Sequence, residues 1–373
     1  DLVQQTYPEA LGQAGVNPAG PPKVDITVEK PGEALEYVAS FEVYPEIKLN
    51  DLSTLKIEKP AVEINEADVD KLVLNLRKAR QTLNDVARAA QIGDTVQVDF
   101  IGRIDGEAFA GSEGKDVSIE LGNNRFLSDL ENGIAGHAAG EEFTVDVKFP
   151  ADYQRENLRD KTAQFSVTLK GVKEPQLPAI DGEFLKAHGV EESAGEAGLR
   201  DKGKTALTKE RDKAIQNRLK VQALDQLLAA HPVEVPVALI EQEIPRLREE
   251  ATARMNVGKI DKDKLRELLP DSIFEQNARR RVTLGLLIGE VIRSKNLQLD
   301  AQRVEKTLDE MAADYEHPEQ VRQFYRGRPD LLQGLRAMVL EDQVVESLIS
   351  GVQPLEVAMS LDELLKPQAQ AQA

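Results

Sequence analysis

The stretch GDTVQVDFIGRIDGEAFAGS, residues 93–112, decides how the middle of this chain folds. Apolar residues alternate with polar ones up to Phe100, and Asp105-Gly106 is a dipeptide typical of tight hairpin turns. The stretch therefore predicts two strands and a turn, with Phe100 on one strand and Phe109 on the other. In a chain with 4% aromatic residues and no Trp, two phenylalanines here indicate either core packing or an aromatic pocket for an apolar ligand.

Three further segments on the C-terminal side of this hairpin show the same alternation. They lie at 117–121, 145–149 and 165–169, and glycines separate them. The stretch 125–135 between two of them has room for a single helix. Together these segments predict an α+β module of about 80 residues, a common size for a small domain.

On the N-terminal side, residues 65–84 predict a long amphipathic helix. Asn65 followed by Asp68 fits a helix N-cap with an acidic third position. The apolar face of this helix is formed by Val69, Leu72, Leu76 and Ala79. Further upstream, residues 1–20 indicate a helix end and a Gly/Pro turn, and a strand is predicted from the alternation of Tyr37, Ala39, Phe41 and Val43.

Residues 180–366 are dominated by helical periodicity, so the C-terminal half is predicted to be all-helical. Pro245 lies inside an otherwise helical segment and predicts a kink or a helix start. Breaks between helices are expected at 231–236, 269–270, 317–318 and 351–354.

Composition excludes several classes of function. The chain has 373 residues, which suggests two or three domains. Its net charge of −18 argues against nonspecific binding to nucleic acid. It has no Cys, its four His are not spaced for a metal site, and no nucleophile elbow or phosphate-binding loop is present. No run of 18 apolar residues predicts a membrane span. We therefore expect no cofactor, metal, membrane or direct nucleic-acid partner, and any catalysis must work without an activated nucleophile.

Aromatic residues are concentrated in the predicted α+β module. The chain has ten Phe and six Tyr, and those that fall within 93–172 are Phe100, Phe109, Phe126, Phe143, Phe149, Tyr153 and Phe165. We interpret Phe143 and Phe149 as core residues. For the other five, a pocket competes with core packing.

The module resembles the FKBP-type peptidyl-prolyl isomerases. The resemblance rests on VQVDFIGRIDGEAF (96–109), LGNNRFLSDLENGIAGHAAGEEF (121–143) and QFSVTLKGVKE (164–174). It implies an antiparallel β half-barrel with one short helix. It also implies that X–Pro bonds isomerise in an apolar pocket whose catalytic residues are Phe100, Phe109, Phe126, Leu127, Leu130, Tyr153 and Phe165, with Val117 binding substrate.

Two departures from the FKBP pattern bear on turnover. The family often has Ile-Pro-Gly and an aromatic residue at the pocket floor, where this chain has Leu127-Ser128-Asp129-Leu130. A leucine floor loses ring area, and Asp129 adds a charge near an apolar site. The residue after Phe109 is commonly acidic in the family and is Ala110 here. A peptide-binding holdase with little or no isomerase turnover is therefore the alternative.

Nearly the whole chain resembles the trigger factor family of ribosome-associated chaperones. Beyond the module, the resemblance rests on NPAG (17–20), FEVYPEIKL (41–49), INEADVDKLVLNLRK (64–78), FPADYQRENLRDK (149–161) and LLIGEVIR (286–293). It implies a cytoplasmic chaperone for nascent or unfolded polypeptides. A periplasmic chaperone-isomerase of the SurA kind is a second alternative.

The trigger factor resemblance implies four segments. Residues 1–46 are expected to be the C-terminal remnant of a ribosome-binding domain, because the family's Gly-Phe-Arg-x-Gly-x-x-Pro docking motif is absent. We therefore expect most of that domain to be missing, and the ribosome to be a partner of the full-length protein. Residues 47–88 are expected to form a linker whose long helix packs on the C-terminal domain. The isomerase domain is expected at 89–174 and an all-α SurA-like chaperone domain at 175–373.

The helical half is expected to hold unfolded chains through apolar residues that remain after helix packing. The substrate-binding candidates are Phe324, Tyr325 and Met338, with Leu331, Leu332, Val357 and Met359 as further possibilities. At any single position, ordinary helix–helix packing is the simpler interpretation.

Overall fold

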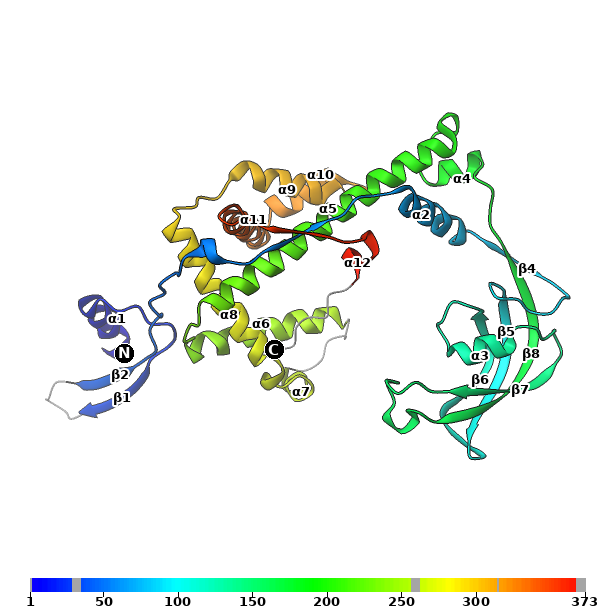
Figure 1. Cartoon of the computed structure of the whole chain (residues 1–373). Coiled ribbons are helices and arrows are strands. Elements are labelled where there is room, and N and C mark those ends of the chain that lie inside the picture. The colour runs from blue at the N-terminus through cyan, green and yellow to red at the C-terminus, as the bar shows by residue number, and fades with distance from the viewer. Residues whose placement is uncertain (1, 29–34, 256–261, 314, 367–373) are drawn as a thin grey trace. The chain divides into compact units, whose positions relative to one another are not determined.

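The computed structural model of the chain describes residues 2–28, 35–255, 262–313 and 315–366. The chain divides into two compact units (Figure 1). One comprises Asp1–Val62 and Arg211–Ala373, and the other comprises Glu63–Glu210.

The second unit contains a five-stranded antiparallel sheet. Its strands are β4 (Thr82–Asp85), β5 (Thr95–Ile104), β6 (Glu107–Glu120), β7 (Glu142–Lys148) and β8 (Thr162–Gln176). The order is β4-β8-β5-β6, and β7 also pairs with β8. The hairpin predicted from residues 93–112 is confirmed as β5 and β6, which turn at Asp105 and Gly106, both at positive φ.

The core of this module lies between the sheet and helix α3 (Ser128–Ile134). Each of five elements contributes a core side chain that is at most 1% exposed: Val98, Ile119, Ile134, Val147 and Leu169. The apolar residues of the alternating segments, such as Val145 and Val147 or Phe165, Val167 and Leu169, thus point into this core. The predicted helix within 125–135 is confirmed.

Helix α2 (Glu66–Lys78) begins as the sequence predicts. The Asn65 side chain accepts from the Asp68 N–H, and the Asp68 side chain accepts from the Asn65 N–H. The predicted helix over 65–84 is nevertheless too long. It ends at Lys78, and residues 82–85 pair instead with 173–176 of β8, because cross-strand hydrogen bonds replace the helical ones.

Helices α4 (Gly182–Ala187) and α5 (Gly195–Ala230) follow the sheet. The first part of α5 packs against α2. Arg200 of α5 pairs with Glu66 at 2.8 Å and with Asp70 at 2.7 Å. These pairs are exposed, so each adds only about 0–1 kcal/mol.

The first unit holds most of the remaining helices. They are α6 (Val237–Arg254), α7 (Lys262–Leu268), α8 (Asp271–Ser294), α9 (Ala301–Ala313), α10 (Pro318–Arg326), α11 (Pro329–Ser350) and α12 (Leu361–Leu365). The four predicted breaks between helices are confirmed. Helix α6 does not begin at Pro245, since it runs through that residue. None of the helices in the described part of the chain combines the length and hydrophobicity that a membrane span needs.

The segment 47–57, which contains a short 3-10 helix (Leu52–Thr54), packs into the core of the first unit, which we call the helical unit. Leu55 and Ile57 join side chains of α5, α8 and α11 in one buried cluster. His231, which is 4% exposed, anchors the segment to the end of α5. Its Nε2 accepts from the Asn50 N–H at 2.8 Å, and its Nδ1 donates to the Leu227 carbonyl at 2.7 Å.

The C-terminal region is not purely helical. Strand β9 (Leu355–Ala358) pairs in parallel with β3 (Glu58–Ala61). The sequence shows no periodicity for a strand of four residues, and its partner lies almost 300 positions earlier. The all-helical prediction for this region is therefore wrong at β9.

The N-terminal part contains α1 (Leu2–Ala14), β1 (Lys23–Val28) and β2 (Glu36–Ser40). The strand predicted through residue 43 is too long, since β2 ends at Ser40. Phe41 instead packs edge-on against the Tyr7 ring, with centroids 6.0 Å apart.

Candidate functional site

Six aromatic rings of the sheet module form a continuous chain of contacts, which we call the aromatic cluster. In order, its members are Phe126, Phe100, Phe165, Phe109, Phe149 and Tyr153. Successive centroids lie 6.5, 5.8, 6.4, 6.0 and 4.8 Å apart, and the interplanar angles of 61–86° make all five contacts edge-to-face. Such pairs each add roughly 0.5–1.5 kcal/mol beyond their burial.

The structure brings the eight predicted module residues together in or beside one core cluster. Six of them are half-buried: Phe100, Phe109, Val117, Phe126, Leu127 and Tyr153. The other two are buried, Phe165 at 6% and Leu130 at 3% exposure. The partly exposed rings offer an apolar surface to a ligand, whereas Phe165 and Leu130 support it from beneath.

Two glycines let the rings approach the backbone of the sheet. A methyl group on Gly102 of β5 would lie 2.7 Å from the Phe165 ring. A methyl group on Gly114 of β6 would lie 2.7 Å from both Phe100 and Val117. Both distances are shorter than carbon atoms tolerate, so the position of each ring depends on the absence of a side chain.

Glu131 organises the loop that carries Phe126. Its side chain is buried, with 1% of the residue exposed. One carboxylate oxygen accepts from the N–H groups of Gly122 (2.8 Å) and Asn124 (3.2 Å), and the other accepts from the Phe126 N–H (3.0 Å). Helix α3 therefore holds this loop through one ionisable side chain.

Phe109 and Tyr153 are held by polar contacts at the edge of the cluster. The buried Ser112 hydroxyl accepts from the Phe109 N–H at 3.2 Å. Arg159 Nε donates to the Tyr153 carbonyl at 2.7 Å. Arg155 spans from the Tyr153 loop to β6.

A residue at each of the two departures from the FKBP pattern forms a hydrogen bond within the module. Asp129 accepts from the Lys148 N–H of β7 at 3.0 Å, so its charge is used to join α3 to the sheet. Ala110, which replaces the common acidic residue, offers its carbonyl to Arg155 at 2.5 Å.

Ion pairs support the strands on either side of the cluster. Asp94, whose side chain is 4% exposed, accepts two hydrogen bonds from Arg88, which hold the pKa of its carboxyl below the ordinary value. Lys170 bridges Asp116 and Asp99, and these bonds raise the pKa of its ammonium group. Both groups are thus charged at neutral pH. Lys170 joins β8 to β5 and β6, whereas Arg88 and Asp94 pair within the segment that leads into β5.

The interpretation of Phe149 as a core residue is confirmed, since it is 3% exposed, and its ring also contacts Phe109 and Tyr153. Sequence reasoning missed two other residues of this site. Glu131 and Arg155 gave no signal, because an acidic residue on a short helix and a basic residue in a loop are usually solvated. The order of FPADYQRENL could have placed Arg155 near Tyr153, but not its contact with β6.

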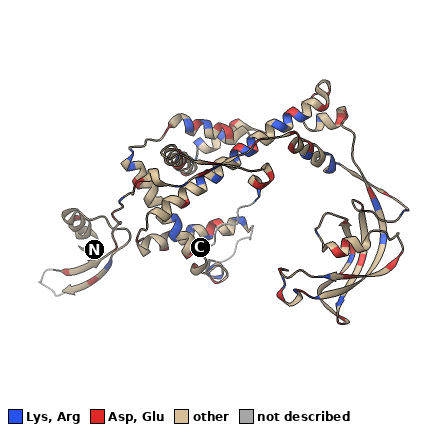
Figure 2. Cartoon of the chain, in the orientation of Figure 1, with Lys and Arg blue, Asp and Glu red and all other residues tan. Residues whose placement is uncertain are grey.

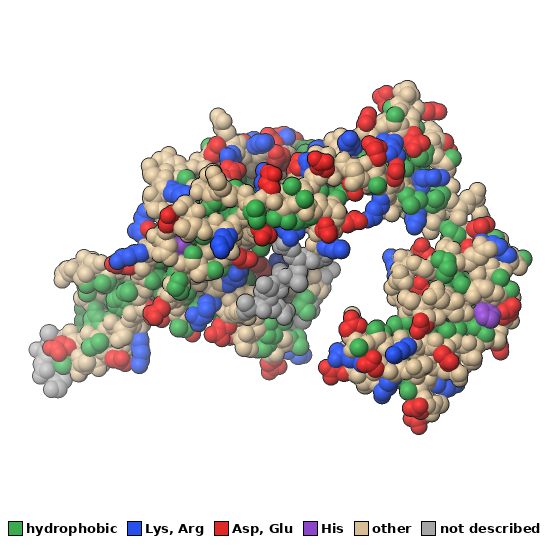
Figure 3. Space-filling model, viewed as in Figure 1, with side chains coloured by type: hydrophobic (Ala, Val, Ile, Leu, Met, Phe, Trp, Pro, Cys, Tyr) green, Lys and Arg blue, Asp and Glu red, His purple; other side chains and the backbone are tan. Residues whose placement is uncertain are grey.

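The three helical-unit candidates do not share one environment. Phe324 is 56% exposed and Met338 is 39% exposed. Tyr325 instead packs against the buried cluster of Val304 and its neighbours. Figure 3 shows other hydrophobic side chains at the surface of both units, set between charged ones.

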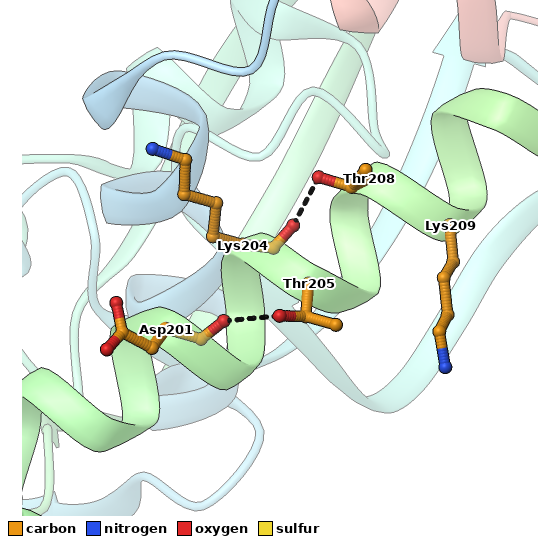
Figure 4. Close-up of a pocket in the computed structure, with 5 residues that line it drawn as sticks. All are labelled: Asp201, Lys204, Thr205, Thr208 and Lys209. Atoms are coloured by element: carbon orange, nitrogen blue, oxygen red, sulfur yellow. Dashed lines mark hydrogen bonds between the residues drawn. The ribbon is translucent and has the colours of Figure 1, made fainter.

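A surface hollow of about 480 Å³ lies elsewhere, along α5. Its lining residues are Asp201, Lys204, Thr205, Thr208 and Lys209 (Figure 4). The two threonine hydroxyls donate to carbonyls of α5 itself, at 2.9 and 2.8 Å. A single helix face with its hydroxyls already bonded is not organised to bind a ligand.

Comparisons with known proteins identify relatives over almost the whole chain. Three family models match it: "Bacterial trigger factor protein (TF)" at residues 1–76, "FKBP-type peptidyl-prolyl cis-trans isomerase" at 86–170, and "Bacterial trigger factor protein (TF) C-terminus" at 197–350. The first match shows that the N-terminal domain is represented in this chain. The expectation that most of it is missing, with 1–46 only a remnant, is therefore wrong.

Two curated relatives are each described as trigger factor. The one from Thioalkalivibrio sulfidiphilus is 43% identical over 367 residues, which cover 98% of this chain and 83% of the relative. The one from Alkalilimnicola ehrlichii is 42% identical over 369 residues, covering 99% and 81%. A solved structure described as "Promiscuous Substrate Recognition in Folding and Assembly Activities of the Trigger Factor Chaperone" covers 93% of this chain and 82% of its own, at 16% identity and a TM-score of 0.41.

Proposed function

The chain belongs to the trigger factor family, and we propose from this that the aromatic cluster is where it isomerises X–Pro bonds. The protein is a chaperone with an FKBP-type peptidyl-prolyl isomerase domain. Its partners are nascent and unfolded polypeptides and the ribosome. The observation that supports the placement is the row of half-buried rings on a rigid antiparallel sheet.

The chemistry fits an apolar site without acids or nucleophiles. Rotation about an X–Pro bond must cross a barrier of about 18–20 kcal/mol, because the amide loses its resonance. A twisted amide is less polar than a planar one, so a surface shielded from water favours it over the ground state. Only such differential binding accelerates the step.

The residues of the aromatic cluster have different roles in this reaction. Phe165 and Phe100 form a base that is held against Gly102 and Gly114. Phe126 at one end and Tyr153 at the other are half-buried and close the sides around a proline ring. A base that cannot move keeps the apolar surface in place while the amide twists.

We place holding of unfolded chains in the helical unit, with Phe324 and Met338 as contact residues because both are exposed. Tyr325 is better assigned to packing. Weak apolar contacts, each worth about 1.5–3 kcal/mol when fully buried, add up over a wide surface without requiring one tight site. We place the protein in the cytoplasm, as its family suggests.

The isomerase proposal is tested by refolding of a proline-limited protein. The wild-type chain should accelerate the slow phase, and Tyr153→Ala should weaken the acceleration. Tyr315→Ala is the matched control, since Tyr315 is 61% exposed in the other unit. Phe165→Ala is a poor probe, because truncating a ring that is this buried lowers the free energy of unfolding by about 3–5 kcal/mol. A wild-type chain that binds the substrate without acceleration would support the holdase alternative instead.

The chaperone proposal is tested by suppression of aggregation of a chemically unfolded client. Asp85 pairs with Lys173, so residues 86–172 can be removed and the adjacent ends joined by a short Gly/Ser linker. Most of the suppression should survive this deletion and should fall when Phe324 and Met338 are both changed to Ser. Leu83→Ser, an exposed apolar position on β4, is the control. A folded deletion variant that suppresses nothing would place the activity elsewhere.

A further inference from the structure

Arg155 lies in the loop between β7 and β8, two residues after Tyr153. Its Nη1 donates to the Ala110 carbonyl of β6 at 2.5 Å. Its guanidinium also lies over Gly111, where a methyl group would come within 3.2 Å of Nη1. Because Ala110 directly follows Phe109, these two contacts place a positive charge at the edge of the aromatic cluster.

The Arg155 guanidinium has most of its N–H donors left for a bound molecule. Arginine has five N–H donors, and the Ala110 carbonyl uses one. Within the described part of the chain, Arg155 forms no ion pair, and the carboxylate of the next residue, Glu156, is engaged by Arg159 at 3.6 Å. Arg155 is an exposed residue, so its remaining donors can reach a bound molecule.

Arg125 provides a contrast at the other end of the cluster. It precedes Phe126 and is exposed, but nothing in the described structure fixes its guanidinium by a hydrogen bond or an ion pair. Arg155 is held at one atom and free at the others, so less of its side-chain entropy remains to be lost on binding.

We propose that Arg155 is a specificity-determining residue that favours substrates with a carboxylate side chain next to the proline. This rests on the proposed function, because it requires a proline ring seated on the cluster. Consecutive Cα atoms are about 3.8 Å apart, so the residues that flank this proline lie at the cluster's edge. A guanidinium binds a carboxylate through two parallel N–H donors, and repels an ammonium group.

The positive charge of Arg155 is opposite in sign to the net charge of the chain. A net charge of −18 repels acidic peptides in general. Acidic and basic residues are interspersed along the chain, as Figure 2 shows for α5 and the sheet. A preference for acidic substrates would therefore have to come from a cation at the site, and it should disappear when that cation is removed.

The test compares catalysed cis/trans exchange of proline peptides by NMR, which needs no coupled protease. One peptide series places Glu, Gln or Lys before the proline, and a second places them after it. In at least one series, wild-type chain should act faster on the Glu peptide than on the Lys peptide. Arg155→Gln should reduce this Glu/Lys rate ratio by about two- to fivefold, the range of an exposed charge pair.

The controls separate specificity from a structural role. Lys173→Gln changes net charge equally but lies eight residues along β8 from Phe165, so it should leave the ratio unchanged. Arg155→Lys should retain part of it. Raising ionic strength from about 0.01 to 1 M shortens the screening length from about 30 to 3 Å and should bring the wild-type ratio toward one.

Two results would overturn the proposal. If Arg155→Gln slows all peptides equally, the residue only supports the loop. If both variants change the ratio alike, the effect is one of net charge. Failure of the proposed function looks different, since the wild-type chain would then not accelerate even the Gln peptides.

Discussion

Replacing Glu131 by Gln should loosen the loop that carries Phe126. The wild-type carboxylate accepts three backbone N–H groups from residues 122, 124 and 126. A glutamine has one acceptor oxygen, which can retain the two bonds now made by Oε2. Its amide N–H group would then face the Phe126 N–H, and two donors would oppose each other.

The expected change in the free energy of loop opening follows from the number of hydrogen bonds that are lost. One hydrogen bond to a charged group is lost, which costs about 1.5–3 kcal/mol, and a buried donor is left unsatisfied. Because the loop is exposed at Asn124, water can offset part of this cost. We therefore expect about 2 kcal/mol, which is roughly a 30-fold change in the opening equilibrium at 1.36 kcal/mol per tenfold.

Amide hydrogen exchange on the whole chain measures this opening directly. Protection of the Phe126 amide should fall roughly 30-fold in Glu131→Gln, and catalysed isomerisation should fall with it. Asn132→Ala, an exposed change on the same helix, should leave both as they are. If Phe126 keeps its wild-type protection in Glu131→Gln, the carboxylate does not hold the loop and our account of the site's geometry is wrong.

Three further changes test other parts of the fold. Gly102→Ala should lower isomerase activity, because its methyl group displaces the Phe165 ring; unchanged activity would mean that the ring's place is not critical. Asp94→Asn should lower the midpoint of thermal unfolding near pH 7. The stabilisation that Arg88 gives Asp94 is complete above the ordinary Asp pKa of about 3.9 and is lost as pH falls through the lower folded value, so the two midpoints should converge in acid. His231→Leu should destabilise the helical unit by about 1–3 kcal/mol in denaturant unfolding, since it leaves a backbone N–H unpaired.

The features that the sequence predicted are those encoded locally. Strand alternation and the turn at Asp105 predicted the central hairpin, because both depend on neighbouring residues. The capping box of Asn65 and Asp68 spans four residues and was visible for the same reason. The fold of the module, an FKBP-like sheet with a separate helical domain, followed from such segments and from the family resemblance.

What the sequence did not predict depends on distant partners. Helix α2 ends at Lys78 because the following strand pairs with β8, about 90 residues later. Strand β9 exists only because β3 lies beside it. Within the site, periodicity identified Phe149 as buried but could not show that its ring contacts Tyr153. The sequence could not show the hydrogen bonds that Glu131 accepts, because the three N–H groups that donate them lie in a loop without a sequence pattern. The extent of the N-terminal domain was underestimated, because the absence of one docking motif does not show that the rest of a domain is absent.

The central claim, that X–Pro bonds turn over on the aromatic cluster, is tested most directly by proline-limited refolding of an unfolded protein at substoichiometric concentrations of this chain. Three forms are compared: wild type, Tyr153→Ala, and the variant that lacks residues 86–172. We expect the wild type to accelerate the slow phase in proportion to its concentration, Tyr153→Ala to do so weakly, and the deletion variant not at all. Equal acceleration by wild type and the deletion variant would contradict the account, because catalysis would then lie outside the sheet module.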